Sequence, residues 1–365
     1  MNRILILTNS IDGLFSFRKE VVVAILSIGY DVYISVPKGN EEKEEYFVNK
    51  GCRIIHQDID RRGTSPLQDF KLLRGYNKLI KRIKPSLILT YTIKPNVYGG
   101  LAARLNKIPQ LANITGLGSS INNKGITSKI ALFLYKFGLS KASIVFYQNN
   151  SIKEFCQNSH IGKEGVLLPG SGVDLNWHSF HKYPENDSVI KFLFIGRIMK
   201  DKGIDEFLLM VKTIRSKYPN TEFHIIGGCE ENYKDILNKY HKDNLLQWHG
   251  TVSDVRPYIK DSHCTILPSY HEGMANVLLE SCAAGRPIIA SNINGCKEAI
   301  DDGINGFLCE VKNSEDLISK VENFINLSYE TKSEMGIAAR KKMEDEFDRK
   351  IVIKKYLEEI DRFIR

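Results

Sequence analysis

The sequence lacks long apolar runs: none of eighteen uncharged apolar residues occurs among its 365 residues. A helix that crosses a bilayer needs about 20 such residues, so we expect no membrane-spanning helix. The chain opens directly on an apolar segment at residues 3–8, without the charged, apolar and small-residue order of a signal peptide. This pattern predicts a cytoplasmic protein.

Cysteine is scarce and irregularly placed. The seven cysteines are odd in number, scattered, and form no Cys-x-x-Cys pair. Such spacing argues against a disulfide framework or a structural zinc site, and most of the thiols lie in apolar stretches where we expect them buried and reduced. We also find no cluster of His and carboxylates typical of a divalent cation site, so we expect function without a metal or cofactor.

Acidic residues are nearly absent from one long tract. Between residues 61 and 150, fifteen Lys and Arg stand against a single acid, Asp69. Residues 126–139 in this tract form a strongly apolar helical pattern, and four lysines border it: Lys124, Lys129, Lys136 and Lys141. Basic charge beside an apolar helix is typical of a surface that lies on an anionic membrane. A core helix with snorkelling lysines is the alternative, whereas nucleic acid is disfavoured because no known nucleic-acid module occurs.

Short apolar runs alternate with helical patterns along the chain, which is typical of parallel sheets covered on both faces. Length and a hydrophobic content of 42% predict two domains, each with its own core. We place them at residues 1–180 and 188–344, with a polar linker at 181–188 and an amphipathic helix at about 345–365. Strands are predicted at 4–8, 31–36, 87–91, 110–115 and 144–147, then at 192–196, 223–227, 246–250, 264–268, 287–290 and 306–309.

The second domain carries two carboxylates separated by seven residues. A predicted strand at 264–268 leads to Glu272, and a helical pattern from 276 to 284 contains Glu280 before Gly285 ends it. Because a helix rises about 1.5 Å per residue, the two carboxylates stand too far apart to share a proton and can hold different parts of one elongated ligand. Taken alone, the spacing would also fit a solvated helix face.

A second segment of this domain carries paired cations. The predicted strand at 192–196 ends in a Gly-Arg turn at Arg197, and Lys202 and Gly203 directly precede a helical pattern. An Arg offers a planar fork to phosphate oxygens and a Lys a mobile point charge, while a helix amino terminus also favours anions. The segment therefore predicts a diphosphate-binding turn, although by itself it would also fit a basic surface turn.

Together these segments resemble the Glu-x7-Glu motif and the cationic turns of the family 4 retaining glycosyltransferases, and residues 172–174, Gly-Val-Asp, resemble the family's domain junction. The resemblance implies the GT-B fold, in which two facing Rossmann-like α/β domains with parallel sheets border a cleft and the final helix packs back on the first domain. It also implies a nucleotide-sugar donor, for which we favour a UDP sugar.

The first domain narrows the resemblance. Phe17-Arg18 and the Gly-Leu-Gly-Ser run that begins at Gly116 are similar to the subgroup that makes capsule, O-antigen and protein-glycan precursors. They look most like the α-1,3-N-acetylgalactosaminyltransferases that act on undecaprenyl-diphospho-bacillosamine. Two positions depart from the family: no His lies between His56 and His160, and Ala275 replaces a frequent Pro. We interpret both as subgroup variation.

The resemblance assigns roles to residues of this chain. Arg197, Lys202 and Glu272 would be catalytic, with the cations on the departing diphosphate and Glu272 on the donor sugar. Other donor-binding residues would be Gly196, Gly228, Val252, Gly273, Met274, Ala275, Asn276 and Glu280, the last of these on the ribose. In the first domain we expect the acceptor at Gly13, Arg18, Arg61, Arg62, Lys94, Thr115 and Gly116, where the cations suit a phosphate-bearing molecule.

We therefore expect a metal-independent, retaining transferase that moves a hexose or N-acetylhexosamine to a lipid-diphosphate-linked saccharide at the inner face of the plasma membrane. Three alternatives stay open: a soluble acceptor, an inactive sugar-binding subunit, and an isomerase or phosphorylase of the same fold. A phosphorylase would need a pyridoxal-binding lysine motif, which we do not find. An inactive subunit would be expected to have lost Arg197, Lys202 or a motif Glu, and all of them are present.

Overall fold

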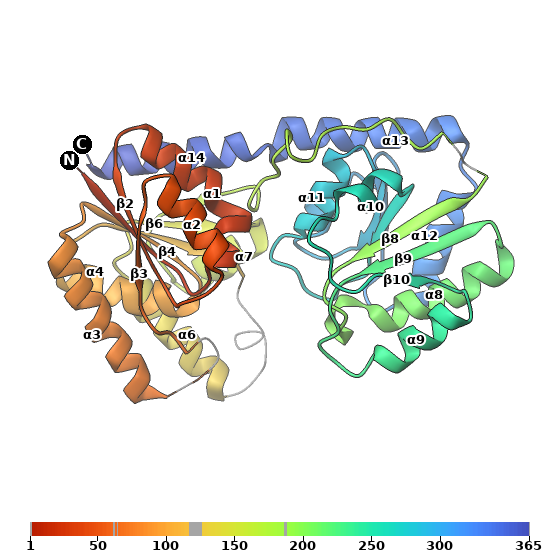
Figure 1. Ribbon diagram of the computed structural model, residues 1–365. Helices are drawn as coiled ribbons and strands as arrows, with labels where there is room; N and C mark the ends of the chain where they lie inside the picture. The colour runs from red at the N-terminus through yellow and green to blue at the C-terminus, as the bar shows by residue number, and fades with distance from the viewer. Residues whose placement is uncertain (1, 61–62, 64, 117–125, 186–187, 365) are drawn as a thin grey trace. The chain divides into compact units, whose positions relative to one another are not determined.

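The computed structural model describes residues 2–364 except 61–62, 64, 117–125 and 186–187. Its contacts divide the chain into two compact units, one of residues 1–171 and 350–365 and the other of residues 172–349. Each unit is built on one parallel sheet with helices on both faces (Figure 1). The GT-B type of architecture expected from the sequence, with two parallel-sheet α/β domains, is therefore confirmed.

Unit 1 contains a seven-stranded sheet in the order β3-β2-β1-β4-β5-β6-β7, and every pairing in it is parallel. The five inner strands are mostly apolar, as expected where both faces of a sheet are buried, whereas the edge strands β3 and β7 are only partly buried. They are β1 (Arg3–Leu7), β2 (Asp31–Val36), β3 (Arg53–His56), β4 (Leu87–Tyr91), β5 (Gln110–Ile114), β6 (Ile144–Tyr147) and β7 (Gly165–Leu167).

Helices cover both faces of this sheet, and alternate side chains of the same strand pack against the helices of opposite faces. On one face, Ile4 and Ile6 of β1 pack in the cluster that includes α1, α2 and α14. On the other, Leu5 and Leu7 pack with α3 and α4, and β5 and β6 pack with α6 and α7. The helices are α1 (Ile11–Ser27), α2 (Glu41–Asn49), α3 (Pro66–Ile83), α4 (Gly100–Leu105) after a π-helical turn at Pro95–Gly99, α6 (Ile126–Leu139), α7 (Asn150–Asn158) and α14 (Arg349–Ile364).

Unit 2 contains a six-stranded sheet in the order β10-β9-β8-β11-β12-β13, again parallel throughout. The strands are β8 (Ile190–Ile195), β9 (Thr221–Ile226), β10 (Gln247–Trp248), β11 (Cys264–Leu267), β12 (Ile288–Ser291) and β13 (Gly306–Cys309). The helices are α8 (Ile204–Lys217), α9 (Lys234–Lys242), α10 (Arg256–Asp261), α11 (Asn276–Ala283), α12 (Ser314–Ile325) and α13 (Tyr329–Lys342), with short turns at Lys200–Lys202, Lys297–Ala299 and Met343–Phe347.

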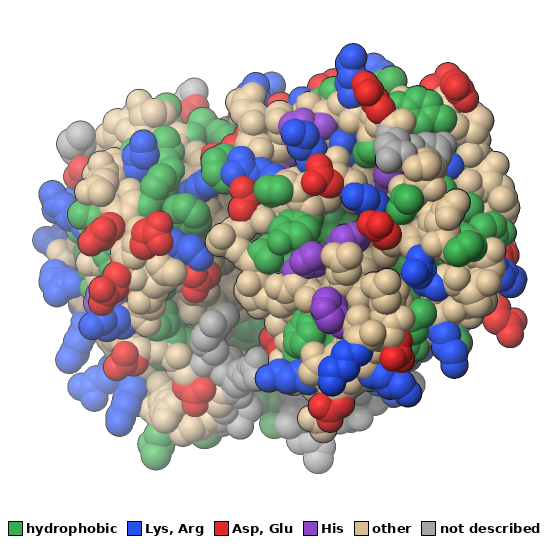
Figure 2. Space-filling model, turned by 45° about the vertical axis from the view of Figure 1, so that its right-hand side comes forward, with side chains coloured by type: hydrophobic (Ala, Val, Ile, Leu, Met, Phe, Trp, Pro, Cys, Tyr) green, Lys and Arg blue, Asp and Glu red, His purple; other side chains and the backbone are tan. Residues whose placement is uncertain are grey.

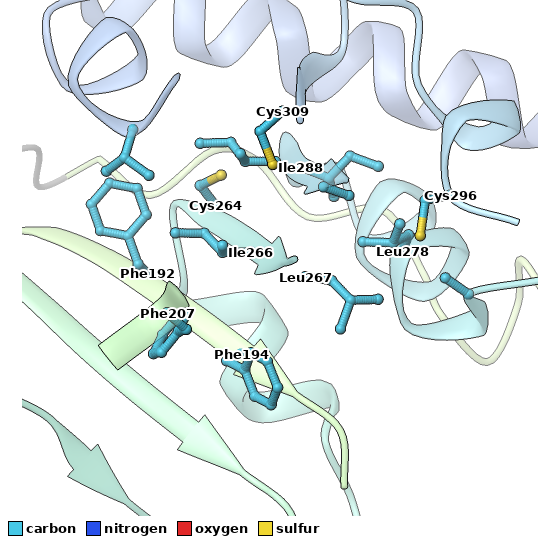
Figure 3. Close-up of a cluster of buried hydrophobic side chains, with 14 of the residues drawn as sticks. Phe192, Phe194, Phe207, Cys264, Ile266, Leu267, Leu278, Ile288, Cys296 and Cys309 are labelled. Carbon is cyan, nitrogen blue, oxygen red and sulfur yellow. The ribbon is translucent and has the colours of Figure 1, made fainter. Parts of the chain in front are cut away.

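A large apolar cluster fills unit 2 and fixes where its loops begin. Phe194 of β8 packs against Phe207 of α8, and Phe192 of β8 lies in the same cluster as Ile266 of β11 and Leu278 of α11 (Figure 3). The strands and the helices that follow them are thus anchored from inside. The loops between them emerge at one edge of the sheet with little freedom.

The polar segment predicted to be a linker packs on unit 2. Arg286, which is 1% exposed, donates hydrogen bonds to the carbonyl oxygens of His181 and Lys182. Tyr183 is buried and lies edge-on to His263 at 5.5 Å between ring centroids. The chain passes between the units earlier, at residues 171–172, and again at 349–350, and α14 belongs almost entirely to unit 1.

Two further features of the structure bear on the sequence predictions. All seven cysteines are free, and six of them are buried, as their apolar surroundings predicted. Within the described part of the chain, no helix combines the length and the apolar character that crossing a bilayer demands.

Candidate active site

The residues of interest in unit 2 lie in loops at one edge of its sheet. Arg197 follows β8, Gly228 follows β9, Val252 follows β10 and Glu272 follows β11. Because all the strands are parallel, their carboxyl ends share an edge, which is where open α/β sheets bind ligands. The order β10-β9-β8-β11 places the four loops side by side.

Lys202 and Glu272 form an ion pair at this edge. The Nζ atom of Lys202 lies 2.5 Å from Oε1 of Glu272, and the two side chains are only 17% and 12% exposed. The Ser269 hydroxyl donates a second hydrogen bond to the same carboxylate oxygen at 2.8 Å. Because the pair is shielded from water and geometrically fixed, it holds a cation and a carboxylate at a defined place in the loop cluster.

The backbone of the Lys202 turn packs closely against the backbone of the loop after β11, and this packing fixes the position of one relative to the other. Gly203 has a φ of +70°, and a Cβ atom there would lie 2.0 Å from the carbonyl oxygen of Pro268. Only glycine fits such a position without displacing a backbone. The Tyr270 amide also donates to the carbonyl oxygen of Asp201 at 2.9 Å, so the Lys202 turn and the Glu272 loop are joined through their main chains.

Arg197 has a more exposed partner. Its guanidinium donates to Glu230 at 2.9 Å, and the side chains are 56% and 44% exposed. Glu231, the next residue, accepts a hydrogen bond from the Lys200 amide at 2.9 Å. Since exposed ion pairs contribute at most about 1 kcal/mol, an anion that reaches Arg197 can replace Glu230 at little cost.

The amino terminus of α11 opens onto the same loop cluster. Ala275 is its N-cap residue and makes no side-chain cap, while Gly273 and Met274 immediately precede it. The Ala275 amide donates to Gly295 in the loop after β12 at 2.8 Å. The Oδ1 atom of Asn276 is buried and has no hydrogen-bond partner. An uncapped helix start next to two cations favours an anion.

Glu280 lies further along α11 and is partly buried. Burial raises the pKa of its carboxyl to about 7, although the positive charge of Arg349 acts in the opposite direction. No hydrogen bond of this carboxylate occurs among the described residues, so the ionised form is kept at a cost. A largely desolvated carboxylate without a hydrogen bond from its own fold is a candidate for binding a ligand.

This cost predicts how Glu280 affects stability. A carboxyl whose pKa is higher in the folded than in the unfolded protein lowers stability as pH rises through the interval between the two values, here from about 4.5 to about 7. Glu280→Gln should therefore raise the free energy of unfolding by about 1 to 3 kcal/mol at pH 8 and have little effect at pH 4.5. Urea unfolding at both pH values measures this difference.

Glu334→Gln is the matched control for this experiment, because Glu334 is an exposed residue of α13. It should leave stability nearly unchanged at both pH values. A Glu280→Gln protein that is no more stable than the wild type at pH 8 would contradict the assignment of a destabilising charge to Glu280.

The residues predicted to bind the acceptor in the first domain lie in several different elements of unit 1. Gly13 lies in the first turn of α1, where its amide donates to the Ser10 hydroxyl, and Lys94 pairs with Asp69 at 2.7 Å. Thr115 and Gly116 follow β5 at the carboxyl edge of the sheet. Arg61 and Arg62 lie outside the described residues.

Arg18 does not present a free cation to an acceptor. It is 2% exposed and lies between Tyr91 and Tyr356, with Nε donating to the Tyr356 hydroxyl at 3.1 Å. Its role as a surface phosphate ligand, expected from its charge, has no support in this arrangement. The burial follows from α14: the return of this helix to the first domain was expected from the resemblance, but the contact of its Tyr356 with Arg18 was not.

Some residues of the site were not singled out from the sequence. Glu230, Glu231 and Ser269 owe their place to contacts between separate loops, and only the repeated acids after Gly227 and Gly228 hinted at it. In the part of the chain that the structure covers, no group of three or more His, Cys, Asp or Glu side chains is arranged to hold a metal ion.

The site therefore combines two cations, a shielded carboxylate, an open helix start and a second carboxylate along the helix. The cations and the helix start can accept an anionic leaving group, and the carboxylates can accept hydrogen bonds from hydroxyl groups. An elongated molecule with a diphosphate between two polyhydroxylated parts matches this order of groups.

Comparison with protein families agrees with this chemistry. Residues 176–342 match the model of the glycosyl transferases group 1, and residues 3–149 match the glycosyl transferase 4-like model. The two matches cover most of both units.

One relative aligns over the full chain, and two others align over most of it. It is 26% identical over 382 aligned residues to the N,N'-diacetylbacillosaminyl-diphospho-undecaprenol alpha-1,3-N-acetylgalactosaminyltransferase of Campylobacter jejuni, covering 100% of this chain and 99% of that one. It is 27% identical to the capsular polysaccharide biosynthesis glycosyltransferase CapM of Staphylococcus aureus, with 88% and 87% covered. A UDP-Gal:alpha-D-GlcNAc-diphosphoundecaprenol alpha-1,3-galactosyltransferase of Escherichia coli is 25% identical, with 77% and 73% covered.

Solved structures share the fold at lower identity. A glycosyltransferase from Rickettsia africae has a TM-score of 0.82 at 19% identity, covering 100% of this chain and 99% of that one. Anabaena Alr3699/HepE in complex with UDP and glucose has a TM-score of 0.79 at 15% identity, with 99% and 100% covered. At these identities the likeness shows the architecture and no more.

Proposed function

The chain belongs to the group 1 and 4-like glycosyltransferases and is a hexosyltransferase, and from this premise we propose that it transfers a hexose or an N-acetylhexosamine from a UDP sugar to a lipid-diphosphate-linked saccharide. The product would be a precursor of a surface polysaccharide. The observation that carries the proposal is the shielded Lys202–Glu272 pair beside Arg197 at the carboxyl edge of unit 2.

In this proposal the donor diphosphate binds Arg197, Lys202 and the amides at the start of α11. It displaces Glu230, whose exposed ion pair with Arg197 occupies the same cation. Glu272 accepts hydrogen bonds from hydroxyls of the donor sugar and Glu280 from the ribose. The loop residues Gly196, Gly228 and Val252, together with Gly273–Asn276, border the nucleotide.

Transfer would proceed with retention and without a covalent glycosyl-enzyme. The bond between the anomeric carbon and the diphosphate oxygen breaks, and the acceptor oxygen forms the new bond on the same face of the sugar. The acceptor proton goes to the leaving phosphate. Because the two cations neutralise the departing diphosphate, the step needs no divalent metal. A glycosidase-like double displacement would need two carboxylates about 5 Å apart across the bond, and Glu272 with Glu280 fit that arrangement poorly.

Two of the relatives support a lipid-linked acceptor, since their names specify undecaprenol-diphosphate sugars. Unit 1 would bind this acceptor near Gly13, Lys94, Thr115 and Gly116. We further propose that unit 1 meets the inner face of the plasma membrane through its basic tract, so that the protein is peripheral and reaches a substrate anchored in lipid.

A thermal-shift panel tests the donor assignment. UDP and UDP-linked hexoses or hexosamines should raise the melting temperature by several degrees, because a ligand present at 100 times its Kd stabilises the native state by about 2.7 kcal/mol. GDP and ADP should have little effect. Glu280→Gln should reduce the shift produced by free UDP, whereas Glu334→Gln should preserve it.

The same panel separates the alternatives. If no nucleotide or nucleotide sugar changes the melting temperature, the donor site is misassigned and an inactive subunit becomes the better explanation. If UDP sugars bind and are transferred only to water-soluble saccharides, the transferase assignment holds and the lipid-linked acceptor is wrong.

A further inference from the structure

Tyr270 is a buried residue of the loop between β11 and α11 that neither the motif nor the proposed mechanism uses. It is 6% exposed, and its hydroxyl donates to the carboxylate of Glu206, with its oxygen 2.8 and 2.9 Å from the two carboxylate oxygens. Glu206 lies in the first turn of α8 and is 9% exposed. Burial and this hydrogen bond raise the pKa of Tyr270, so the phenol stays protonated and remains the donor.

A buried carboxylate needs compensation, and here it has two sources. The amino terminus of α8 favours a negative charge in its first turn. The Tyr270 hydroxyl supplies a hydrogen bond to a charged acceptor, which is stronger than a bond between neutral groups. The contact is therefore a firm attachment between α8 and the loop after β11.

This attachment spans the two loops that carry the catalytic candidates. Tyr270 is two residues before Glu272, and Glu206 is four residues after Lys202. At its other end, the Tyr270 amide donates to Asp201, which immediately precedes Lys202. One side chain and its own amide thus tie both sides of the Lys202 turn to the loop that carries Glu272.

From this geometry we infer that Tyr270 and Glu206 are positioning residues, which fix Lys202 and Glu272 relative to each other for sugar transfer. The inference rests on the proposed transferase function. A displacement of reacting groups by about 1 Å can lower a rate by about 100-fold. Loss of the Tyr270–Glu206 hydrogen bond should therefore lower kcat. Free UDP should be affected much less, because Lys202 keeps its charge near the diphosphate in these variants, and Arg197 and Glu280 lie outside the tie.

The chain supplies its own control in a second bond of the same kind. The Tyr233 hydroxyl donates to Asp205 at 3.0 Å, and Asp205 is the neighbour of Glu206 in the same helical turn. This second pair is exposed and joins α8 to the segment before α9 instead of to the Glu272 loop. Removing it deletes the same chemistry at the loop after β9, without touching the contact between α8 and the loop that carries Glu272.

The experiment compares kcat and donor KM, together with the Kd of free UDP, in Tyr270→Phe and Glu206→Ala. Each change should lower kcat by about 10- to 100-fold and leave the Kd for UDP within about twofold. Glu206→Gln retains an acceptor for the phenol and should recover part of the loss. The double variant should be no worse than the more affected single variant, because both changes break one contact.

Tyr233→Phe and Asp205→Asn should retain wild-type kcat. The inference fails if Tyr270→Phe keeps full turnover, if the exposed pair costs as much as the buried one, or if UDP affinity falls in parallel with kcat. A wild-type protein that binds UDP and transfers sugar, while Tyr270→Phe does the same at an equal rate, overturns only the positioning role. Wild-type protein without nucleotide binding overturns the proposed function itself.

Discussion

Replacing Lys202 with alanine should lower the rate of sugar transfer by about 100-fold or more, since it removes a charge aimed at the leaving group. The structure gives this lysine a second task, because its ammonium group is the ion-pair partner of Glu272 at 2.5 Å. The variant therefore loses both the cation at the diphosphate and the partner that orients the donor-sugar carboxylate. Steady-state kinetics with the UDP sugar selected by thermal shift measure the effect on kcat.

Arg197→Ala should also reduce turnover by about 100-fold, for the electrostatic reason alone. Its partner Glu230 is exposed, so little structural damage is expected from losing that pair. Lys200→Ala is the matched control: Lys200 is an exposed cation two residues from Lys202 whose amide, not its ammonium group, holds Glu231. It should retain nearly full activity.

The effect of removing divalent metal ions also tests whether Arg197 and Lys202 form the diphosphate site. If two protein cations neutralise the departing diphosphate, chelation with EDTA should leave wild-type turnover nearly unchanged. Strict dependence on magnesium or manganese, or full activity of Lys202→Ala, would show that the diphosphate site has been assigned to the wrong residues.

The sequence was sufficient to locate the strand, turn and helix around the Glu-x7-Glu motif of unit 2, because their signals are local. The predicted strand at 264–268 is β11 at Cys264–Leu267, and the predicted helix at 276–284 is α11 at Asn276–Ala283. Gly285, predicted to end that helix, has a φ of +77°. An apolar run, a glycine and a helical period each depend on neighbouring residues, so they can be recognised without the rest of the fold.

Features that depend on distant partners could not be predicted. Residues 181–188 have the composition of a linker, but the buried guanidinium of Arg286 takes its hydrogen-bond acceptors from them. Arg18 seemed available for a phosphate until Tyr356 of α14, 338 residues away, packed over it. Strands β3 and β7 were missed because they are short and only partly buried. For residues 181–188 and for Arg18, the deciding contact joins segments that local sequence does not relate.

The structure shows which helices of the basic tract at residues 61–150 carry exposed apolar side chains. Helices α3, α4 and α6 cover the same side of the unit 1 sheet, with α4 in contact with both others. Large apolar side chains are exposed on α3 and α6: Leu67 at 77%, Phe70 at 59%, Ile130 at 54%, Phe133 at 65% and Phe137 at 49%. Leu132, in contrast, packs partly against the core. Over the visible face of unit 2, basic and acidic side chains are mixed (Figure 2).

Phe133 and Phe137 form an exposed aromatic pair on α6. Their rings stack at 6.2 Å between centroids, and Arg104 of α4 lies over Phe137 at 5.8 Å. Lys129 is an exposed cation on the same helix, and Lys136 is another. Contiguous aromatic surface beside cations is unfavourable in water and matches the boundary between lipid headgroups and acyl chains.

The protein should therefore sediment with anionic liposomes at low salt, and reversing two charges on α6 should release it. Each cation near such a surface contributes about 1 kcal/mol, so the double variant Lys129→Glu and Lys136→Glu should lower the partition coefficient by 100-fold or more. Binding of the wild type should weaken as salt rises, since the attraction decays over about 8 Å at physiological ionic strength while the apolar contribution persists.

Reversing Lys239 and Lys242, which are exposed on α9 of unit 2, changes the net charge equally and should leave sedimentation intact. Thermal shift with UDP should be the same in both double variants, because the proposed donor residues lie elsewhere, in the loops at the carboxyl edge of the unit 2 sheet. If the wild type stays in the supernatant at low salt, or both double variants behave alike, the membrane-facing role of α6 is wrong and a soluble acceptor becomes the better proposal.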